Sequence, residues 1–244
     1  MIDVDWDGPI ATIALARGSA RNAVPVAGWE RLAAHAADLR DARVVILRSA
    51  MPAMFSAGAD IGEFAQLQTD PAARSRFRMG MRAAIDAVAA LPMPVLAAVD
   101  GGCFGAAVAL ILAADLRIAG DAAQFAVTPA RLGLGYPRED VARLAAQVGH
   151  GQAGALLFTG ETIDADAAAG INLVERRAPQ AAPAALTLAQ RIAENAPNAV
   201  RQLKRALHHP ADTALDAAFE AAFGGTELAE GLAAFQGRRR PVFP

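Results

Sequence analysis

One segment, residues 95–119, constrains the possible folds of this chain more than any other. It opens with five consecutive apolar residues (95–99), passes through a glycine-rich turn (101–105) and then runs without a charge over residues 106–114, before a second β-prone run at 116–119. Short apolar runs without polar alternation are typical of strands covered on both faces, and an uncharged helix has to be buried. The segment therefore predicts strand, turn, buried helix and strand at the centre of an α/β fold.

The remainder of the chain extends this alternation of strands and helices. Asp7-Gly8 is a turn dipeptide between two β-prone runs, which predicts an opening hairpin. Pro92 and Pro94 must end the helix before them, because proline lacks a backbone donor and restrains the residue that precedes it. The expected strands are 2–6, 10–15, 44–47, 95–99, 116–119 and 173–176, and the expected helices are 26–39, 71–91, 106–114, 139–148, 153–158 and 165–169, with a helical region from 181 onward.

Length and charge narrow the class of protein. A chain of 244 residues that is 54% apolar can bury one large core, and no linker divides it, so we expect a single domain over 1–244. The formal net charge is -2 and no basic block recurs, which argues against nucleic acid or a membrane as partner and favours a small molecule. Cys103 is the only cysteine and the acidic start lacks the features of a signal peptide, so we expect a soluble, cytoplasmic protein.

One motif invites a misleading interpretation. Residues 149–154 match the G-x-G-x-x-G pattern of dinucleotide sites. That motif follows a strand, whereas this one follows the amphipathic run 141–148, and no acidic residue closes a second strand at the expected distance. We therefore predict a helix-to-helix turn here, without a nucleotide.

Two turns rich in small residues are the candidates for chemistry. Residues 55–61 follow an apolar strand, and their small side chains leave the backbone amides open to a ligand. Residues 101–105 open the uncharged helix at Ala106, where unpaired N–H groups favour developing negative charge. Amides from both turns could converge on one oxygen. Asp60 and Glu63 stand at N-cap and N3 spacing, so a capping role for Asp60 is favoured over catalysis.

These features together resemble the crotonase, or enoyl-CoA hydratase/isomerase, superfamily. The likeness runs in order and spacing along nearly the whole chain. It is carried by Leu15-Ala16-Arg17 with Asn22-Ala23, residues 55–61, residues 99–115, Ala123-Gln124-Phe125, Leu132-Gly133-Leu134, Phe158-Thr159-Gly160, and Glu230-Gly231 with Phe235.

The resemblance implies a fold and a reaction principle. The fold would be a crotonase-like ββα superhelix, with a spiral core over 1–195 and a C-terminal helical trimerisation region over 196–244. The amides of Ala57 and Ala106 would form an oxyanion hole that holds the thioester carbonyl of an acyl-CoA substrate as it becomes an enolate. Coenzyme A would enter as part of the substrate, with no separate cofactor, and the assembly would be a homotrimer or a hexamer of two trimers. The residues themselves predict no metal, because no histidine and acid cluster has metal-ligand spacing.

The resemblance also implies contacts with the substrate. The backbone of Ala59, Asp60 and Ile61 would line the adenine pocket, Arg17 would lie near the coenzyme A phosphates, and the arginines at 238–240 would lie near a neighbouring subunit's ligand. The full set of expected substrate-binding residues is Arg17, Ala57, Gly58, Ala59, Asp60, Ile61, Gly105 and Ala106.

The chain departs from the family at two positions. Hydratases of the family hold water between two glutamates, and these positions correspond to Ala109 and Pro129 here. Neither side chain can transfer a proton, so water addition by the usual route is not expected. The loop 128–137 instead resembles that of decarboxylases of malonyl-type thioesters, which makes Tyr136 the leading candidate for a catalytic side chain, although those enzymes usually have histidine in place of Ala59. The alternative is a packed tyrosine with a solvated hydroxyl, which is the more common role of a lone tyrosine in a loop.

Three hypotheses remain open at this point. The first is an acyl-CoA enzyme of the enoyl-CoA hydratase/isomerase class that depends on the oxyanion hole. The second is a decarboxylase of malonyl-type acyl-CoA, and the third is a non-catalytic acyl-CoA-binding subunit. Glu139 and Asp140 follow the same loop, but their positions in the first turn of a helix suit the helix dipole better than catalysis.

Overall fold

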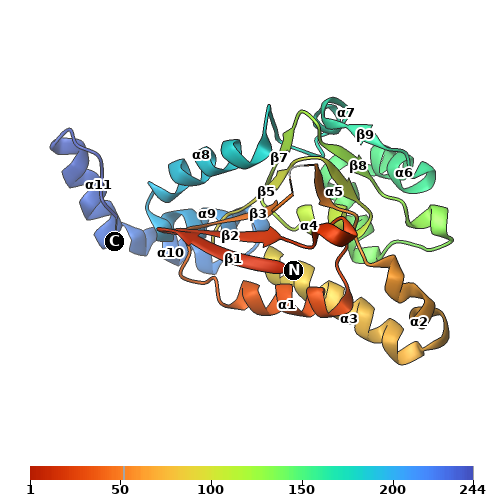
Figure 1. Ribbon diagram of the computed structural model, residues 1–244. Coiled ribbons are helices and arrows are strands. Elements are labelled where there is room, and N and C mark those ends of the chain that lie inside the picture. Colours follow the sequence, from red (N-terminus) through yellow and green to blue (C-terminus); the bar gives the residue numbers. More distant parts are fainter. Residues whose placement is uncertain (52, 244) are drawn as a thin grey trace.

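Two β-sheets form the centre of the protein, seen in a computed structural model that describes residues 1–51 and 53–243 (Figure 1). The larger sheet has the strand order β1-β2-β3-β5-β7-β10. Its strands are β1 (Ile2–Asp7), β2 (Ile10–Leu15), β3 (Val44–Ser49), β5 (Val95–Val99), β7 (Leu116–Gly120) and β10 (Arg176–Ala178). The predicted opening hairpin is confirmed, because β1 and β2 pair antiparallel across Asp7-Gly8.

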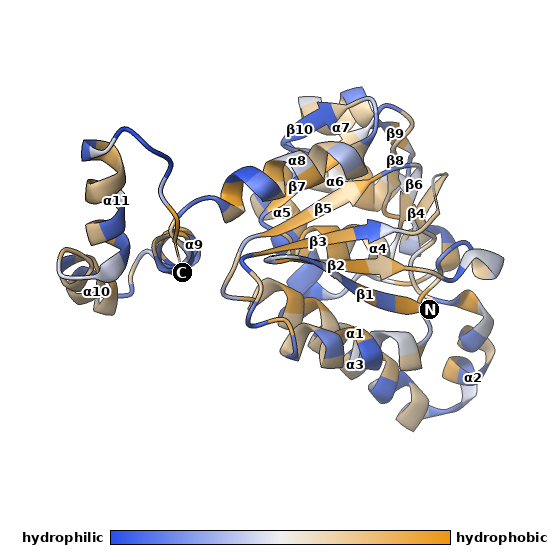
Figure 2. Cartoon of the chain, turned by 60° about the vertical axis from the view of Figure 1, so that its left-hand side comes forward, coloured by the Kyte–Doolittle hydropathy of each residue, from blue (hydrophilic) through white to orange (hydrophobic). Residues whose placement is uncertain are grey.

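After this hairpin every pairing in the larger sheet is parallel, as an alternation of strands and helices requires. Because successive side chains of a strand point to opposite faces of the sheet, alternate residues of β3 face two separate cores. Val45 and Leu47 belong to the main core, whereas Val44 and Ile46 pack with the alanines of α8 (Ala181–Ala193). Burial on both faces explains why β3 and β5 lack polar alternation, and Figure 2 shows both strands as predominantly hydrophobic.

The smaller sheet was not predicted. Its order is β4-β6-β8-β9, formed by β4 (Met54–Ser56), β6 (Gly102–Phe104), β8 (Gln124–Ala126) and β9 (Ile163–Asp164). Strands of two or three residues give no measurable periodicity, and β6 lies inside the segment expected to be only a turn. This sheet matters for function because β4 and β6 pair in parallel and both lead into the two candidate turns.

Helices surround the sheets and mostly follow the predicted segments. Besides α8 they are α1 (Val26–Ala37), α2 (Phe64–Thr69), α3 (Pro71–Ala89), α4 (Ala106–Ile111), α5 (Arg138–Val148), α6 (His150–Thr159), α7 (Ala165–Gly170), α9 (Pro197–His208), α10 (Ala214–Ala222) and α11 (Thr226–Gln236). The G-x-G-x-x-G segment is the predicted helix-to-helix turn, since α5 ends at Val148 and α6 begins at His150.

Several boundaries differ from the prediction by a few residues, and two of the differences can be related to particular contacts. Helix α4 ends at Ile111 instead of 114, because the buried Arg117 side chain donates a 2.8 Å hydrogen bond to the Ala114 carbonyl and so holds the chain in turns. The last strand lies at 176–178 instead of 173–176. Leu173 is buried, but its amide bonds the Ala168 carbonyl that closes α7, so it is not free to join the sheet.

The last helices leave the body of the protein. Figures 1 and 2 show α10 and α11 standing apart from the sheets, joined to them through α9. Their large apolar side chains are exposed, including Phe219 (64%), Phe223 (67%) and Phe235 (83%). Within residues 1–51 and 53–243, no helix combines the length and the hydropathy needed to cross a bilayer.

Candidate active site

The first candidate turn follows β4 and is held by a buried polar network. Asn22 and Ser56 are both buried, and the Ser56 hydroxyl donates to the Asn22 carbonyl at 2.7 Å while accepting the Gly58 amide at 3.0 Å. The Asn22 side chain donates in turn to the Phe55 carbonyl at 3.0 Å. Fully satisfied buried networks specify one conformation. Asn22 and Ser56 are thus supporting residues whose function the sequence motif did not reveal.

The second candidate turn carries the chain from β6 into α4. Gly105 has φ +55°, a left-handed conformation that glycine adopts without the steric cost of a side chain. Its amide donates to the Ala126 carbonyl of β8 at 2.9 Å, so the smaller sheet fixes its position. Ala106 follows as the first residue of α4 and is 9% exposed.

The structure brings the two turns into direct contact. Gly58 has φ +92°, and a Cβ added there would lie 2.5 Å from the Phe104 carbonyl oxygen and 3.0 Å from the Ala106 nitrogen. Atoms that close leave no room for a side chain, so only glycine permits this approach. The expectation that the two turns meet is therefore supported by the geometry of Gly58.

The choice of Ala57 as an oxyanion donor is wrong, however. Its amide donates to the Arg21 carbonyl at 3.0 Å and is not free for a ligand. The neighbouring amides are also engaged, since Gly58 bonds Ser56 and Asp60 bonds the Val24 carbonyl at 3.1 Å.

Ala59 supplies a free amide in this turn. Val24 pairs with Ala59 in a parallel bridge. The Val24 amide donates to the Gly58 carbonyl and the Val24 carbonyl accepts the Asp60 amide, so both bonds are made by the neighbours of Ala59. Because successive amides of an extended chain point to opposite sides, the Ala59 N–H points away from Val24. Among the described residues, the amides of Ala59 and Ala106 have no hydrogen-bond acceptor. Two unpaired donors on touching turns can hold one oxygen that gains negative charge.

The residues expected at the coenzyme A end lie beside this turn. The Arg17 guanidinium pairs with Asp60 at 2.6 Å and also donates to the Ala23 carbonyl at 2.9 Å. Ile61 follows Asp60 and is 58% exposed, which is unusual for so apolar a residue. Arg17, Asp60 and Ile61 are therefore neighbours at the mouth of the first turn.

The capping role predicted for Asp60 is confirmed, but that of Glu63 is not. Asp60 accepts the Gly62 amide at 3.0 Å and so caps a short 3-10 helix, η2 (Ile61–Glu63). Glu63 does not reach back to Asp60. Its carboxylate accepts the Val26 amide at 2.9 Å, which fixes the start of α1 against this loop.

Tyr136 reaches the second turn. Its hydroxyl donates to the Gly105 carbonyl at 3.0 Å, one residue before Ala106. Burial raises the pKa of Tyr136 well above its ordinary value, and the negative charge of Asp140 raises it further. The phenol therefore stays protonated and acts here as a hydrogen-bond donor.

The two positions that the resemblance relates to the family's glutamates have no acidic side chain on their own elements. Ala109 is fully buried in α4, and Pro129 begins a short 3-10 helix, η3 (Pro129–Leu132). Glu139 pairs with Arg138 on the surface at 3.0 Å, whereas Asp140 is fully buried and pairs with Arg82 at 2.7 Å. Cys103 is buried, and burial raises the pKa of its thiol well above its usual range.

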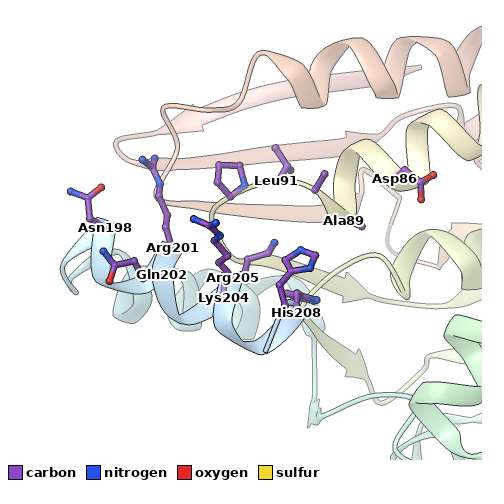
Figure 3. A pocket seen from close by; sticks show the side chains of 12 residues that line it. Asp86, Ala89, Leu91, Asn198, Arg201, Gln202, Lys204, Arg205 and His208 are labelled. Carbon is purple, nitrogen blue, oxygen red and sulfur yellow. The ribbon is translucent and has the colours of Figure 1, made fainter. Parts of the chain in front are cut away.

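A pocket of about 710 Å³ lies elsewhere (Figure 3). It is bordered by Leu91 before β5 and by α9, whereas the candidate turn at 101–105 follows the other end of β5. A five-residue strand spans about 16 Å. Lys204, which lines the pocket, is 8% exposed and binds Asp115 at 2.7 Å, so it ties α9 to the sheet. We therefore assign this pocket a place outside the candidate site.

The sequence is similar to those of known proteins. Residues 6–244 match the family model described as enoyl-CoA hydratase/isomerase. The chain is 33% identical over 255 residues to a human protein named enoyl-CoA hydratase domain-containing protein 2, mitochondrial, covering 97% of this chain and 86% of that protein. It is 29% identical to rat methylglutaconyl-CoA hydratase, mitochondrial, covering 82% and 67%.

Solved structures are similar as well. An enoyl-CoA hydratase/carnithine racemase from Magnetospirillum magneticum superposes with a TM-score of 0.94 at 32% identity, covering 100% of this chain and 95% of that one. An enoyl-CoA hydratase from Bacillus anthracis superposes with a TM-score of 0.92 at 30% identity, covering 99% and 98%. In sequence and in fold, the chain belongs to the enoyl-CoA hydratase/isomerase, or crotonase, family.

Proposed function

We propose that this protein binds an acyl-CoA thioester and stabilises the enolate formed from it with the amides of Ala59 and Ala106. The observation that carries the proposal is the contact between the two turns at Gly58, which sets these unpaired donors next to each other. Coenzyme A takes part as a portion of the substrate, and the proposal includes no further cofactor.

The two amides act on the thioester oxygen. When the α-carbon loses a proton or a carboxyl group, the electron pair moves toward the carbonyl, and the oxygen becomes negatively charged. Fixed donors stabilise this charge without reorganising, and removing one such donor typically costs roughly 3 to 4 kcal/mol of transition-state stabilisation. Arg17 and the exposed Ile61 lie beside the first turn, where the coenzyme A portion would bind.

The side chains argue against two-carboxylate hydration. Ala109 and Pro129 stand at the family's glutamate positions, so no carboxylate from either holds a water molecule. We therefore place the reaction among enolate chemistries of the family that do not depend on that pair.

A second candidate is decarboxylation of a malonyl-type thioester. It is supported by the resemblance of the loop 128–137 to that of such decarboxylases and by the position of Tyr136 beside the turn that carries Ala106, where its single O–H is donated to the Gly105 carbonyl at 3.0 Å. In this reaction the bond between the α-carbon and the carboxylate breaks, CO2 leaves, and the electron pair is delocalised onto the thioester oxygen. No base is needed for that step, which suits a site without the two glutamates.

We also propose that the C-terminal helical region 196–244 joins copies of this chain into a homotrimer or a hexamer. Its support is the exposed apolar surface of α10 and α11. Light scattering that gives the mass of one chain would contradict the assembly without touching the catalytic proposal.

The test is a panel of enoyl-, hydroxyacyl- and malonyl-type thioesters with two variants of Ala106. Ala106→Pro removes one donor at the first helical position, where proline is tolerated, and should lower turnover by about 10²- to 10³-fold. Ala106→Gly keeps the amide and should remain close to wild type. Equal turnover by all three proteins would refute the oxyanion hole, and thioester binding without any turnover would establish a non-catalytic binding subunit.

A further inference from the structure

A smaller pocket lies between α3 and the start of α5 and has no assigned role. Its volume is about 360 Å³, and three of the six residues that line it are arginines. The six are Arg78, Met81, Arg82, Pro137, Arg138 and Glu139.

This pocket borders the candidate site through Tyr136. The Tyr136 hydroxyl contacts the turn that carries Ala106, and Pro137, the next residue, already lines the pocket. Arg82 also lines the pocket, and it binds Asp140, which follows Tyr136 by four residues, at 2.7 Å. A group at the far end of a short acyl chain bound at Ala106 would therefore meet this pocket.

The inner wall of the pocket is a buried charge cluster. Asp140 is fully buried and binds Arg82 at 2.7 Å, with Arg143 3.7 Å away. Among the described residues, Arg143 Nη1 is buried without a hydrogen-bond partner, whereas Arg82 Nη2 lies 2.8 Å from an Asp86 oxygen. One oxygen of Asp140 is also unpartnered. Buried donors without partners mark a place where a polar group can bind.

The charge balance favours an anion. Glu139, the one acidic residue lining the pocket, is paired with Arg138 at 3.0 Å. Arg78 has no carboxylate partner among residues 1–51 and 53–243. The pocket and the buried cluster behind it together leave one positive charge. They contain four arginines and three carboxylates, which are Arg78, Arg82, Arg138 and Arg143, and Asp86, Glu139 and Asp140. Guanidinium groups bind carboxylates with paired, charge-assisted hydrogen bonds.

We propose that this pocket receives an acidic group at the far end of the acyl chain, so that the substrate is the thioester of a dicarboxylic acid. The inference rests on the proposed function, since it assumes that the thioester lies at Ala59 and Ala106. Asp140 is a positioning residue in this account, because it orients Arg82 without facing the substrate carbonyl. An aliphatic chain without the acid would leave the Arg78 guanidinium without a carboxylate partner.

The experiment measures binding and does not depend on the reaction subtype. Malonyl-, succinyl- and glutaryl-CoA are each compared by calorimetry with the corresponding methyl ester, which has the same chain but no charge. Wild type should bind at least one of the three acids about five- to tenfold more tightly than its ester, and this preference should shrink in high salt.

Arg78→Gln should remove most of that preference while leaving the affinity for the ester unchanged. Arg74→Gln is the matched control, because Arg74 is exposed on the same helix and does not line the pocket. Equal affinity of wild type for acid and ester at all three lengths would overturn the inference and leave the proposed function intact. Equal weakening of every thioester in Arg78→Gln would assign the pocket to coenzyme A phosphates instead, and failure of all thioesters to bind would refute the proposed function as well.

Discussion

Replacing Gly58 with alanine would push apart the two turns that carry the proposed oxyanion donors. The new Cβ would lie 2.5 Å from the Phe104 carbonyl oxygen and 3.0 Å from the Ala106 nitrogen, both of them backbone atoms. Real Cβ contacts are essentially never shorter than 3.0 Å, so the turns must separate by about 0.5 Å or more. Because Gly58 has φ +92°, any side chain there also strains the backbone.

The expected loss follows from these two terms. Left-handed strain at a non-glycine residue costs roughly 1 to 2 kcal/mol, so the free energy of unfolding should fall by at least that amount. Misplacing donors by about 1 Å typically lowers a rate by about 10²-fold, because the hydrogen bonds to the developing charge are stretched. We therefore expect turnover in Gly58→Ala to fall by one to two orders of magnitude, with kcat falling by a larger factor than KM rises.

Urea unfolding and thioester turnover are measured together on the same preparation. Gly135→Ala is the control, because Gly135 lies in the loop before α5, lacks a positive φ and has nothing within 4 Å of an added Cβ. The control should keep both stability and turnover. A folded Gly58→Ala protein with wild-type kcat would show that the approach of the two turns does not matter for the reaction.

Three further perturbations test separate parts of the structure. Tyr136→Phe removes the bond to the Gly105 carbonyl and should lower stability by about 1 kcal/mol, whereas turnover falls only if the phenol takes part; unchanged turnover with intact binding excludes it from the mechanism. Because burial raises the pKa of this single tyrosine, its alkaline absorbance change should be missing near pH 10 in the folded state, and stability should fall above that pH as the unfolded chain loses the proton. A normal tyrosine titration in the folded protein would contradict the burial. Lys204→Met should cost about 3 kcal/mol in urea unfolding because it leaves Asp115 with one partner fewer, whereas Arg205→Met on the surface should change stability by less than about 1 kcal/mol.

The main architecture was predictable because it depends on long, strong patterns. The apolar runs of β3 and β5 and the uncharged start of α4 are buried as their composition requires. The smaller sheet escaped prediction, since a strand such as β6 has only three residues and starts with glycine. Its pairing is decided by tertiary contacts that a local pattern does not contain.

The candidate site, too, was predictable from the sequence only in part. The meeting of two glycine-containing turns could be inferred from their residue types, but the identity of the free amide in the first turn could not. Ala57 and Ala59 are the same residue type two positions apart, and only the bond from Ala57 to the Arg21 carbonyl distinguishes them. The direction of an N–H group depends on backbone dihedrals and on a partner 36 residues away, neither of which composition reveals.

The pairing of Tyr136 with Gly105 was likewise beyond the sequence. The loop 128–137 indicated Tyr136 as a candidate, but not whether its hydroxyl would be solvated, catalytic or bonded to the backbone. Its 3.0 Å bond to the turn before Ala106 connects it to the site through position, while its chemical part in the reaction stays a prediction.

A crystal structure with a bound, unreactive acyl-CoA analogue tests the central claim most directly. The account predicts the thioester oxygen within about 2.7 to 3.1 Å of both the Ala59 and the Ala106 nitrogens, with Ala57 still bonded to Arg21. A thioester oxygen out of reach of these two amides, or held by other groups, would contradict it.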